Sequence, residues 1–292
     1  MLRSYGEDMY LSLLFASTAL AGWPEDVNLA GMTEQDGVLQ VDTETLSEDY
    51  RQLIRELGVA VGQRGVLPAH TLGARGFEVT ADTNLNFRIP WDQPDDYSPW
   101  QRAHTNEDPG EFLFQPGISV RKGLPFSLEV GLGGRWIGQS RQGVITGFAR
   151  AAVVEGYKPY PDINVHVGGS GYVGNSQLEL GVFDAGVTIG TRAPLGPPKG
   201  ARAAALAPFV DVTVLVITSA PKIDTSTRAQ IGATAFGNRD VDEDPLNNAK
   251  ALAVPTFNGG LQLDAGNVAL RFSGGWALNA APWAAASVGF TY

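Results

Sequence analysis

From residue 77 onward, apolar and polar side chains alternate along the chain with a period of two. Between Phe77 and Ile89 the odd positions are mostly apolar, and every even position is polar. Alternation over this length is typical of a β-strand with one apolar and one polar face. The same pattern returns over residues 126–136 and 268–276, so the chain contains at least three such strands.

Less regular alternation predicts seven further strands, for an expected total of about ten and a range of about eight to twelve. These strands lie near residues 112–121, 144–155, 162–174, 178–191, 205–218, 252–264 and 283–292. Within 178–191 the apolar positions change parity between Val182 and Phe183. This change predicts a β-bulge in that strand.

The spacing of aromatic residues indicates which face of these strands meets which environment. Phe77 and Phe87 share a face ten residues apart, and so do Phe126 and Trp136. Ten residues of tilted strand rise about 25 Å, the distance between the two aromatic girdles of a membrane barrel. We therefore expect Phe77, Phe87, Phe126, Trp136 and Trp276 to form such girdles, with the apolar face turned to lipid.

The C-terminus and the lengths of the connections favour the same interpretation over a soluble β-sandwich. The last strand ends on an apolar face with Val288, Phe290 and Tyr292, which resembles the insertion signal of bacterial outer-membrane proteins. The long connections 90–111 and 219–251 fall on one side in this strand order, and the short turns 122–125 and 264–267 fall on the other. The sequence thus predicts an all-β fold, an antiparallel transmembrane β-barrel over residues 74–292.

Before the barrel the apolar period is 3.6 residues rather than two. Leu46, Tyr50, Leu53, Ile54 and Leu57 share one face, which predicts a short N-terminal helix over residues 46–57 that ends at Gly58. The surrounding segment, residues 22–73, is expected to lie in the periplasm or to plug the barrel. The simpler alternative is that the helix only packs against the rest of the fold.

The first 21 residues end on a short apolar stretch and Ala19-Leu20-Ala21. This pattern predicts a secretory signal peptide over residues 1–21, and a buried N-terminal helix is the alternative. The net charge is −10, so we expect no nucleic acid among the partners. The chain contains no Cys, which excludes disulfides and thiolate metal sites.

Four short motifs carry a family resemblance. They are Glu56-Leu-Gly, Leu67-Pro-Ala-His-Thr-Leu-Gly73, Gly76-Phe-Glu78 and Lys122-Gly-Leu-Pro-Phe126. They are similar to segments of an uncharacterised outer-membrane barrel family of proteobacteria, myxobacteria among them. The resemblance implies a Gram-negative outer-membrane barrel and brings no catalytic, cofactor-binding or metal-binding residues with it.

The polar faces of the strands should line the lumen. Such residues either form a selectivity constriction for a small polar solute or form a structural network of Arg–carboxylate pairs. A count of about ten strands favours a lumen close to filled by side chains. The lumen-facing candidates are Glu78, Asp82, Arg88, Arg121, Glu129, Arg135, Arg150, His166, Asp211 and Arg271.

Enzymatic alternatives are weakly supported. A barrel of this size resembles the omptin proteases, and loop 91–104 offers several acids and His104. However, the Asp–His pair that such a site needs from the opposite wall is missing. Asp240-Val-Asp-Glu-Asp244 imitates the start of a calcium loop, but Pro245 and Ala251 occupy positions that require Gly and Glu. We expect neither an enzyme nor a cofactor.

The expected function is therefore that of an outer-membrane protein, a narrow channel or small-solute transporter. A structural or adhesive surface barrel with a filled lumen is the alternative, and an omptin-like protease is a remote one. The expected partners are outer-membrane lipid and lipopolysaccharide, the barrel-assembly machinery and an unknown small solute.

Overall fold

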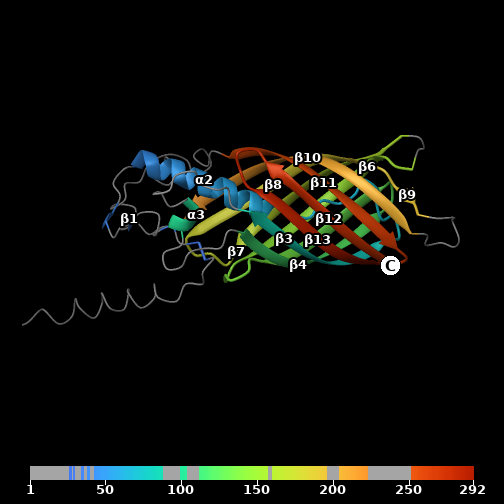
Figure 1. Ribbon diagram of the computed structural model, residues 1–292, viewed down its shortest axis with the longest axis horizontal. Coiled ribbons are helices and arrows are strands. Elements are labelled where there is room, and N and C mark those ends of the chain that lie inside the picture. The colour runs from blue at the N-terminus through green and yellow to red at the C-terminus, as the bar shows by residue number, and fades with distance from the viewer. Residues whose placement is uncertain are drawn as a thin grey trace, which may run out of the picture.

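The computed structural model describes most of the barrel and much of the segment before it (Figure 1). The described residues are 26–27, 29, 34–35, 38–39, 43–87, 99–103, 112–156, 160–195, 204–222 and 251–292. The predicted signal peptide, His104, Arg88 and the acidic run 240–244 lie outside them.

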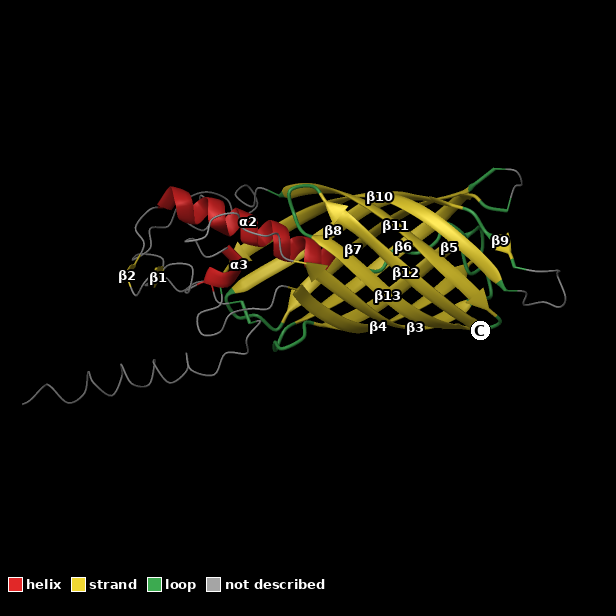
Figure 2. Cartoon of the chain, viewed as in Figure 1, coloured by secondary structure: helices red, strands yellow, loops and turns green. Residues whose placement is uncertain are grey.

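Ten antiparallel strands form a closed barrel, as the alternation predicted (Figure 2). The barrel closes where β13 pairs with β3, and Tyr292 N donates a 2.8 Å hydrogen bond to Phe77 O. β9 (Ala193–Pro194) is an additional two-residue strand on β10. The barrel strands are β3 (Phe77–Phe87), β4 (Phe112–Leu124), β5 (Leu128–Trp136), β6 (Gly143–Val154), β7 (Asp162–Val173), β8 (Leu178–Gly190), β10 (Ala205–Pro221), β11 (Leu252–Ala265), β12 (Val268–Ala277) and β13 (Pro282–Thr291).

The two mouths of the barrel differ. The connections β3–β4, β5–β6, β7–β8, β10–β11 and β12–β13 surround one, called here the loop mouth. The chain ends of the barrel, at Phe77 and Tyr292, lie at the other, the terminal mouth, with the short turns β4–β5 and β11–β12. The two long connections thus share a mouth, as predicted from their positions in the strand order.

The apolar face of the strands turns outward. Leu132 and Ile118, in the middle of their strands, are each 65% exposed. The five aromatic residues predicted to form girdles are also exposed: Phe87, Trp136 and Trp276 lie near the loop mouth, and Phe77 and Phe126 near the terminal mouth. Val288, Phe290 and Tyr292 are exposed on the last strand.

The N-terminal helix α2 (Thr43–Gly62) is longer than predicted. Its four described stripe residues, Tyr50, Leu53, Ile54 and Leu57, are buried. The prediction that Gly58 ends the helix was wrong, because Gly58 is a position of close approach instead. A Cβ added there would lie 2.6 Å from Ile217 of β10, and one added at Gly62 would lie 2.8 Å from Val182 of β8.

The bulge predicted in β8 was also wrong. Pairing with β10 is continuous from Leu178 to Gly190, and the even-numbered residues face inward throughout. The parity change has a chemical cause: the inward face is apolar up to Val182, where it meets α2, and becomes polar at Asp184. The register shift in the barrel lies elsewhere, in β6 between Ala152 and Val154.

The remaining described elements are small. β1 (Glu34–Gln35) and β2 (Val38–Leu39) pair with each other, and α3 (Pro99–Arg102) lies beside α2 in the β3–β4 connection. Among the described helices none is both long and apolar enough to cross a membrane.

Candidate functional site

The lumen is crossed by the chain's own residues 63–73, called here the crossing segment. Helix α2 enters at the loop mouth, where Tyr50 Oη donates a 3.2 Å hydrogen bond to Ser219 Oγ of β10. At the opposite end, Thr71 N donates a 2.6 Å bond to Glu155, which follows β6 at the terminal mouth. The chain then turns at Gly73–Gly76 into β3. We expected residues 22–73 to lie in the periplasm or to plug the barrel. In the structure residues 63–73 run through the lumen, and the helix lies at the loop mouth (Figure 1).

Most inward-facing side chains in the half of the lumen near the loop mouth are apolar. Leu57 of α2 is 1% exposed and belongs to one buried cluster with inward-facing residues of several strands. Burial of apolar area stabilises α2 in this position. The helix needs few polar partners from the wall, because it satisfies most of its own main-chain hydrogen bonds. The strand residues of this cluster include Leu113, Val144, Tyr172, Leu178, Leu180, Val182, Leu215, Ile217 and Val254.

Beyond Gly62 the lumen wall becomes polar and binds the crossing segment through its main chain. Arg135 donates to Val61 O at 2.8 Å and to Gln63 O. Asn84, which is fully buried, donates to the same Gln63 oxygen at 3.0 Å. These donors occupy carbonyls that neither a helix nor a sheet satisfies at this point.

The second half of the crossing segment is held in the same way. Arg150 donates to Pro68 O and, at 3.3 Å, to His70 O. Leu72 N donates a 3.1 Å hydrogen bond to Glu129 of β5. Carbonyls of the segment thus meet arginines, and its amide groups meet carboxylates.

The same charged side chains pair with one another around the wall. Glu78 accepts from Arg121 at 2.8 Å and from Arg271 at 2.6 Å. Glu129 contacts Arg121 at 3.2 Å and Arg150 at 3.9 Å. Glu78 and Glu129 are at most 1% exposed, so this buried network depends on mutual charge neutralisation.

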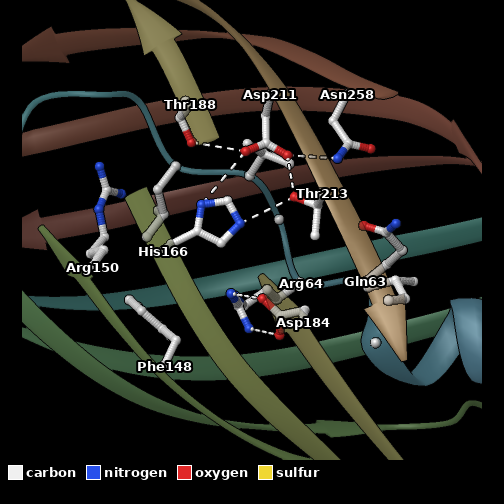
Figure 3. A pocket seen from close by; sticks show the side chains of 15 residues that line it. Gln63, Arg64, Phe148, Arg150, His166, Asp184, Thr188, Asp211, Thr213 and Asn258 are labelled. Atoms are coloured by element: carbon white, nitrogen blue, oxygen red, sulfur yellow. Dashed lines mark hydrogen bonds and ion pairs between the residues drawn. The ribbon is translucent and has the colours of Figure 1, made fainter. Parts of the chain in front are cut away.

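Arg64 is the crossing-segment residue that forms an ion pair with the wall. Its guanidinium forms two hydrogen bonds with Asp184 of β8, one of them 2.6 Å long. The same guanidinium lies 5.1 Å from the ring centre of Phe148, which is a cation–π contact. Figure 3 shows both partners beside it. The wall strand β7 has Gly168 next to Arg64, where any Cβ would collide with the guanidinium.

A second polar cluster surrounds Asp211 (Figure 3). Its carboxylate accepts hydrogen bonds from Thr213 at 2.6 Å, Asn258 at 2.8 Å and Thr188 at 2.9 Å. His166 lies 3.6 Å from the carboxylate through Nδ1 and 3.1 Å from Thr213 Oγ1 through Nε2. The Thr213 hydroxyl donates its proton to a hydrogen bond with Asp211 and not to His166. The cluster therefore lacks the geometry of a hydroxyl nucleophile activated by a histidine base.

Small cavities flank the crossing segment. One, beside Asp211 and His166, offers about 40 Å³ to the centres of water molecules, and the other, beside Asp82 and Arg135, offers about 50 Å³. Arg64, Gly65, Val66 and Leu67 contribute to the walls of both. Each has room for a few waters.

The structure places nine of the ten lumen-facing candidates on the inner face, and Arg88 is outside the described residues. Six of them belong to the contacts above through ion pairs or hydrogen bonds, and His166 and Asp211 form their own cluster. Asp82 stands at the edge, with a 3.4 Å bond from Ser119.

Sequence reasoning missed Asp184 and the crossing segment's Arg64. The alternation in β8 would have shown Asp184 if its parity had been kept constant.

No group of three His, Asp or Glu residues suited to a metal ion occurs within the described part of the chain.

Neither a family model nor a curated protein matches the chain. Solved structures of bacterial barrels are similar to it at low identity. The N-terminal β-barrel domain of Pseudomonas aeruginosa OprF has 12% identity and a TM-score of 0.27, over 75% of this chain and 99% of that one. The Acinetobacter baumannii outer membrane protein Omp33 has 8% identity and a TM-score of 0.26, over 75% and 98%.

The translocator domain of autotransporter NalP from Neisseria meningitidis has 12% identity and a TM-score of 0.28, over 85% of this chain and 97% of that one. Likenesses of this size do not identify a function. The fold assignment rests on the strand pairings themselves.

Proposed function

We propose that this protein is a bacterial outer-membrane β-barrel closed by its own N-terminal segment. In this proposal the barrel holds α2 and the long connections at its outer mouth, as a structural or adhesive surface protein does. The observation that carries the proposal is the crossing segment, which is bound to the wall from Gln63 to Leu72. Beside the crossing segment the lumen holds two cavities that offer about 40 and 50 Å³ to the centres of water molecules.

The outward face supports the membrane location. It is apolar across the barrel and has exposed aromatic residues near both mouths, which suits lipid between two interfaces. The closed pairing of β13 with β3 leaves no free strand edge, as a hydrocarbon environment requires. Phe290 and Tyr292 would provide the contact with the barrel-assembly machinery, and lipopolysaccharide would surround the loop mouth.

A narrow, gated channel is the second candidate. Its support is the pair of cavities beside the crossing segment, which share Arg64, Gly65, Val66 and Leu67 in their walls and would join if the segment left the lumen. We assign no catalytic step and no cofactor, because the Asp211 cluster is arranged to satisfy its own hydrogen bonds.

Single-cysteine variants test which mouth of the barrel faces the outside of the cell, since the natural chain has no cysteine. Arg51 on α2 and Ala74 at the terminal mouth are both exposed. In intact cells a membrane-impermeant maleimide should label Arg51→Cys and should leave Ala74→Cys unlabelled until the outer membrane is permeabilised. The reverse labelling would contradict the proposed orientation.

Planar-bilayer recordings test the closure. The full-length protein should insert without stable conductance, and insertion is checked by protease protection of the barrel. Steady conductance of the unmodified protein would contradict the closed barrel and favour the channel.

A further inference from the structure

We infer that the lumen is a binding site for an extended polypeptide, recognised through its main chain and through one arginine. The inference concerns the polar half of the lumen and is independent of membrane orientation and of surface display. The crossing segment is then the ligand that the chain itself supplies.

The first argument is the kind of atom that the wall contacts. Arg135, Asn84 and Arg150 donate to carbonyl oxygens, and Glu129 and Glu155 accept from amide nitrogens. Every residue except proline offers both groups in an extended chain. Such contacts bind a backbone path. Thr71 adds a side-chain contact, because its hydroxyl also donates to Glu155 at 3.0 Å.

The second argument is the spacing of these contacts. They occur at residues 61, 63, 68, 70, 71 and 72, with the wall arginines at the carbonyls and the wall carboxylates at the amides. Arg135, Arg150 and Glu129 are buried, and an empty lumen would remove their main-chain partners, which is costly. The wall therefore favours occupation by a main chain.

The third argument is the room around the side chains. Val66 and Leu67 are only partly buried and border the two cavities. Gly65 also has space, since an added Cβ would meet Ala285 Cβ at an ordinary 3.8 Å. Other side chains at these positions would displace cavity water without moving the wall.

Arg64 fixes the register of the bound segment. It pairs with Asp184 and lies over Phe148, and the wall glycine Gly168 gives it space. The ligand class is thus an extended peptide with an arginine at the position that reaches Asp184.

The test uses the full-length chain with two substitutions. Arg64→Ala weakens the binding of the chain's own crossing segment to the wall, and Ala285→Cys provides the thiol. The probe is a synthetic peptide of residues 61–73 with Cys in place of Gly65. The 3.8 Å separation at this pair suits a disulfide. The disulfide adduct forms under oxidising thiol exchange and is measured by mass spectrometry. The peptide is used at millimolar concentration, because the tethered crossing segment competes with it at a millimolar effective concentration.

Two altered peptides separate main-chain from side-chain recognition. One replaces Val66, Leu67 and Leu72 with Ser and should form the adduct within about threefold of the parent peptide. The other replaces Arg64 with Ala and should form about tenfold less. The matched protein control is Ala284→Cys, whose side chain lies on the opposite face of β13 and should give only background adduct.

Folding of each variant is checked by heat-modifiable migration. A separate variant with both Gly65→Cys and Ala285→Cys in one chain should form the disulfide, which checks the position of the crossing segment. Arg64→Gln replaces Arg64→Ala if the latter fails to fold. Adduct at Ala285→Cys no higher than at Ala284→Cys would overturn the site. Loss of adduct with the Ser-substituted peptide would overturn main-chain recognition, and equal adduct with the Ala peptide would overturn the register role of Arg64.

Discussion

The two halves of the lumen hold the same N-terminal segment by different physical means. Near the loop mouth the segment is a helix in an apolar cavity, with Leu57 and Ile217 each 1% exposed. Toward the terminal mouth it is extended, and arginines and carboxylates of the wall contact its carbonyl and amide groups.

The difference follows from where the main-chain hydrogen bonds are satisfied. A helix forms them internally and can enter an apolar lumen at little cost. An extended chain exposes every amide and carbonyl and needs a polar wall. The wall changes from Val182 to Asp184 along β8, close to Gly62, where the helix ends. Matched substitutions in the two halves test this difference.

The largest effect should come from Glu78→Ala in the charged half. It would leave Arg121 and Arg271 buried without their shared carboxylate, and we expect a loss of about 3–5 kcal/mol in the free energy of unfolding. Guanidinium titration in lipid vesicles measures it. Glu179→Ala, at an exposed pair with Lys222, is the control and should cause no measurable loss. Equal losses at the two positions would contradict the charged network.

Leu57→Ala in the apolar half should cost about 2–4 kcal/mol, because it opens a cavity between α2 and the wall. Leu67→Ala removes the same atoms from the polar half, where the side chain is partly buried beside cavity water, and should cost about 1 kcal/mol. The same titration compares them. If Leu67→Ala were the more costly variant, the division of the lumen into two kinds of contact would fail.

Two glycines sharpen the contrast. Gly58→Ala should cost about 1–3 kcal/mol despite the better helix propensity of alanine, because its Cβ would lie 2.6 Å from Ile217. Gly65→Ala, whose Cβ would have 3.8 Å to Ala285, should be close to neutral. A stabilising Gly58→Ala, seen as a higher denaturation midpoint, would show that α2 can move away from β10.

The smallest effect is expected from Tyr50→Phe, which removes the hydrogen bond to Ser219 and should cost about 1 kcal/mol at neutral pH. Burial raises the pKa of Tyr50 to about 12, above that of an unfolded tyrosine. The native protein should therefore lose stability as the pH rises from about 10 to about 12, and Tyr50→Phe should lose less. Parallel alkaline curves for both proteins would contradict this.

The barrel was predictable because alternation is a local property of the chain. The period of two in 77–89 and 126–136 gives each strand its faces, and a one-residue error would turn the charged side chains to the outer face. The expected bounds differ from the observed strands by a few residues. The strand β8 was predicted and only its bulge was wrong, because the inward face is apolar up to Val182, where it meets α2.

The lumen was less predictable. Its candidates were found by their parity, but Asn84 gives no signal in the sequence that it binds Gln63 O. Gly58 carries the pattern of a helix end, whereas its role is to let α2 approach Ile217. Contacts between distant parts of the chain leave little trace in local periodicity.

The sequence by itself determined the strands, their two faces, their order along the chain and the amphipathic helix, because each depends on neighbours within a few residues. Tertiary structure alone decided that residues 63–73 run through the lumen and that Arg64 meets Asp184 on β8, 120 positions later. The physical reason is that a polar inner face is compatible with water, with paired charges or with a second main chain. Only the closed barrel shows which of these satisfies its buried groups.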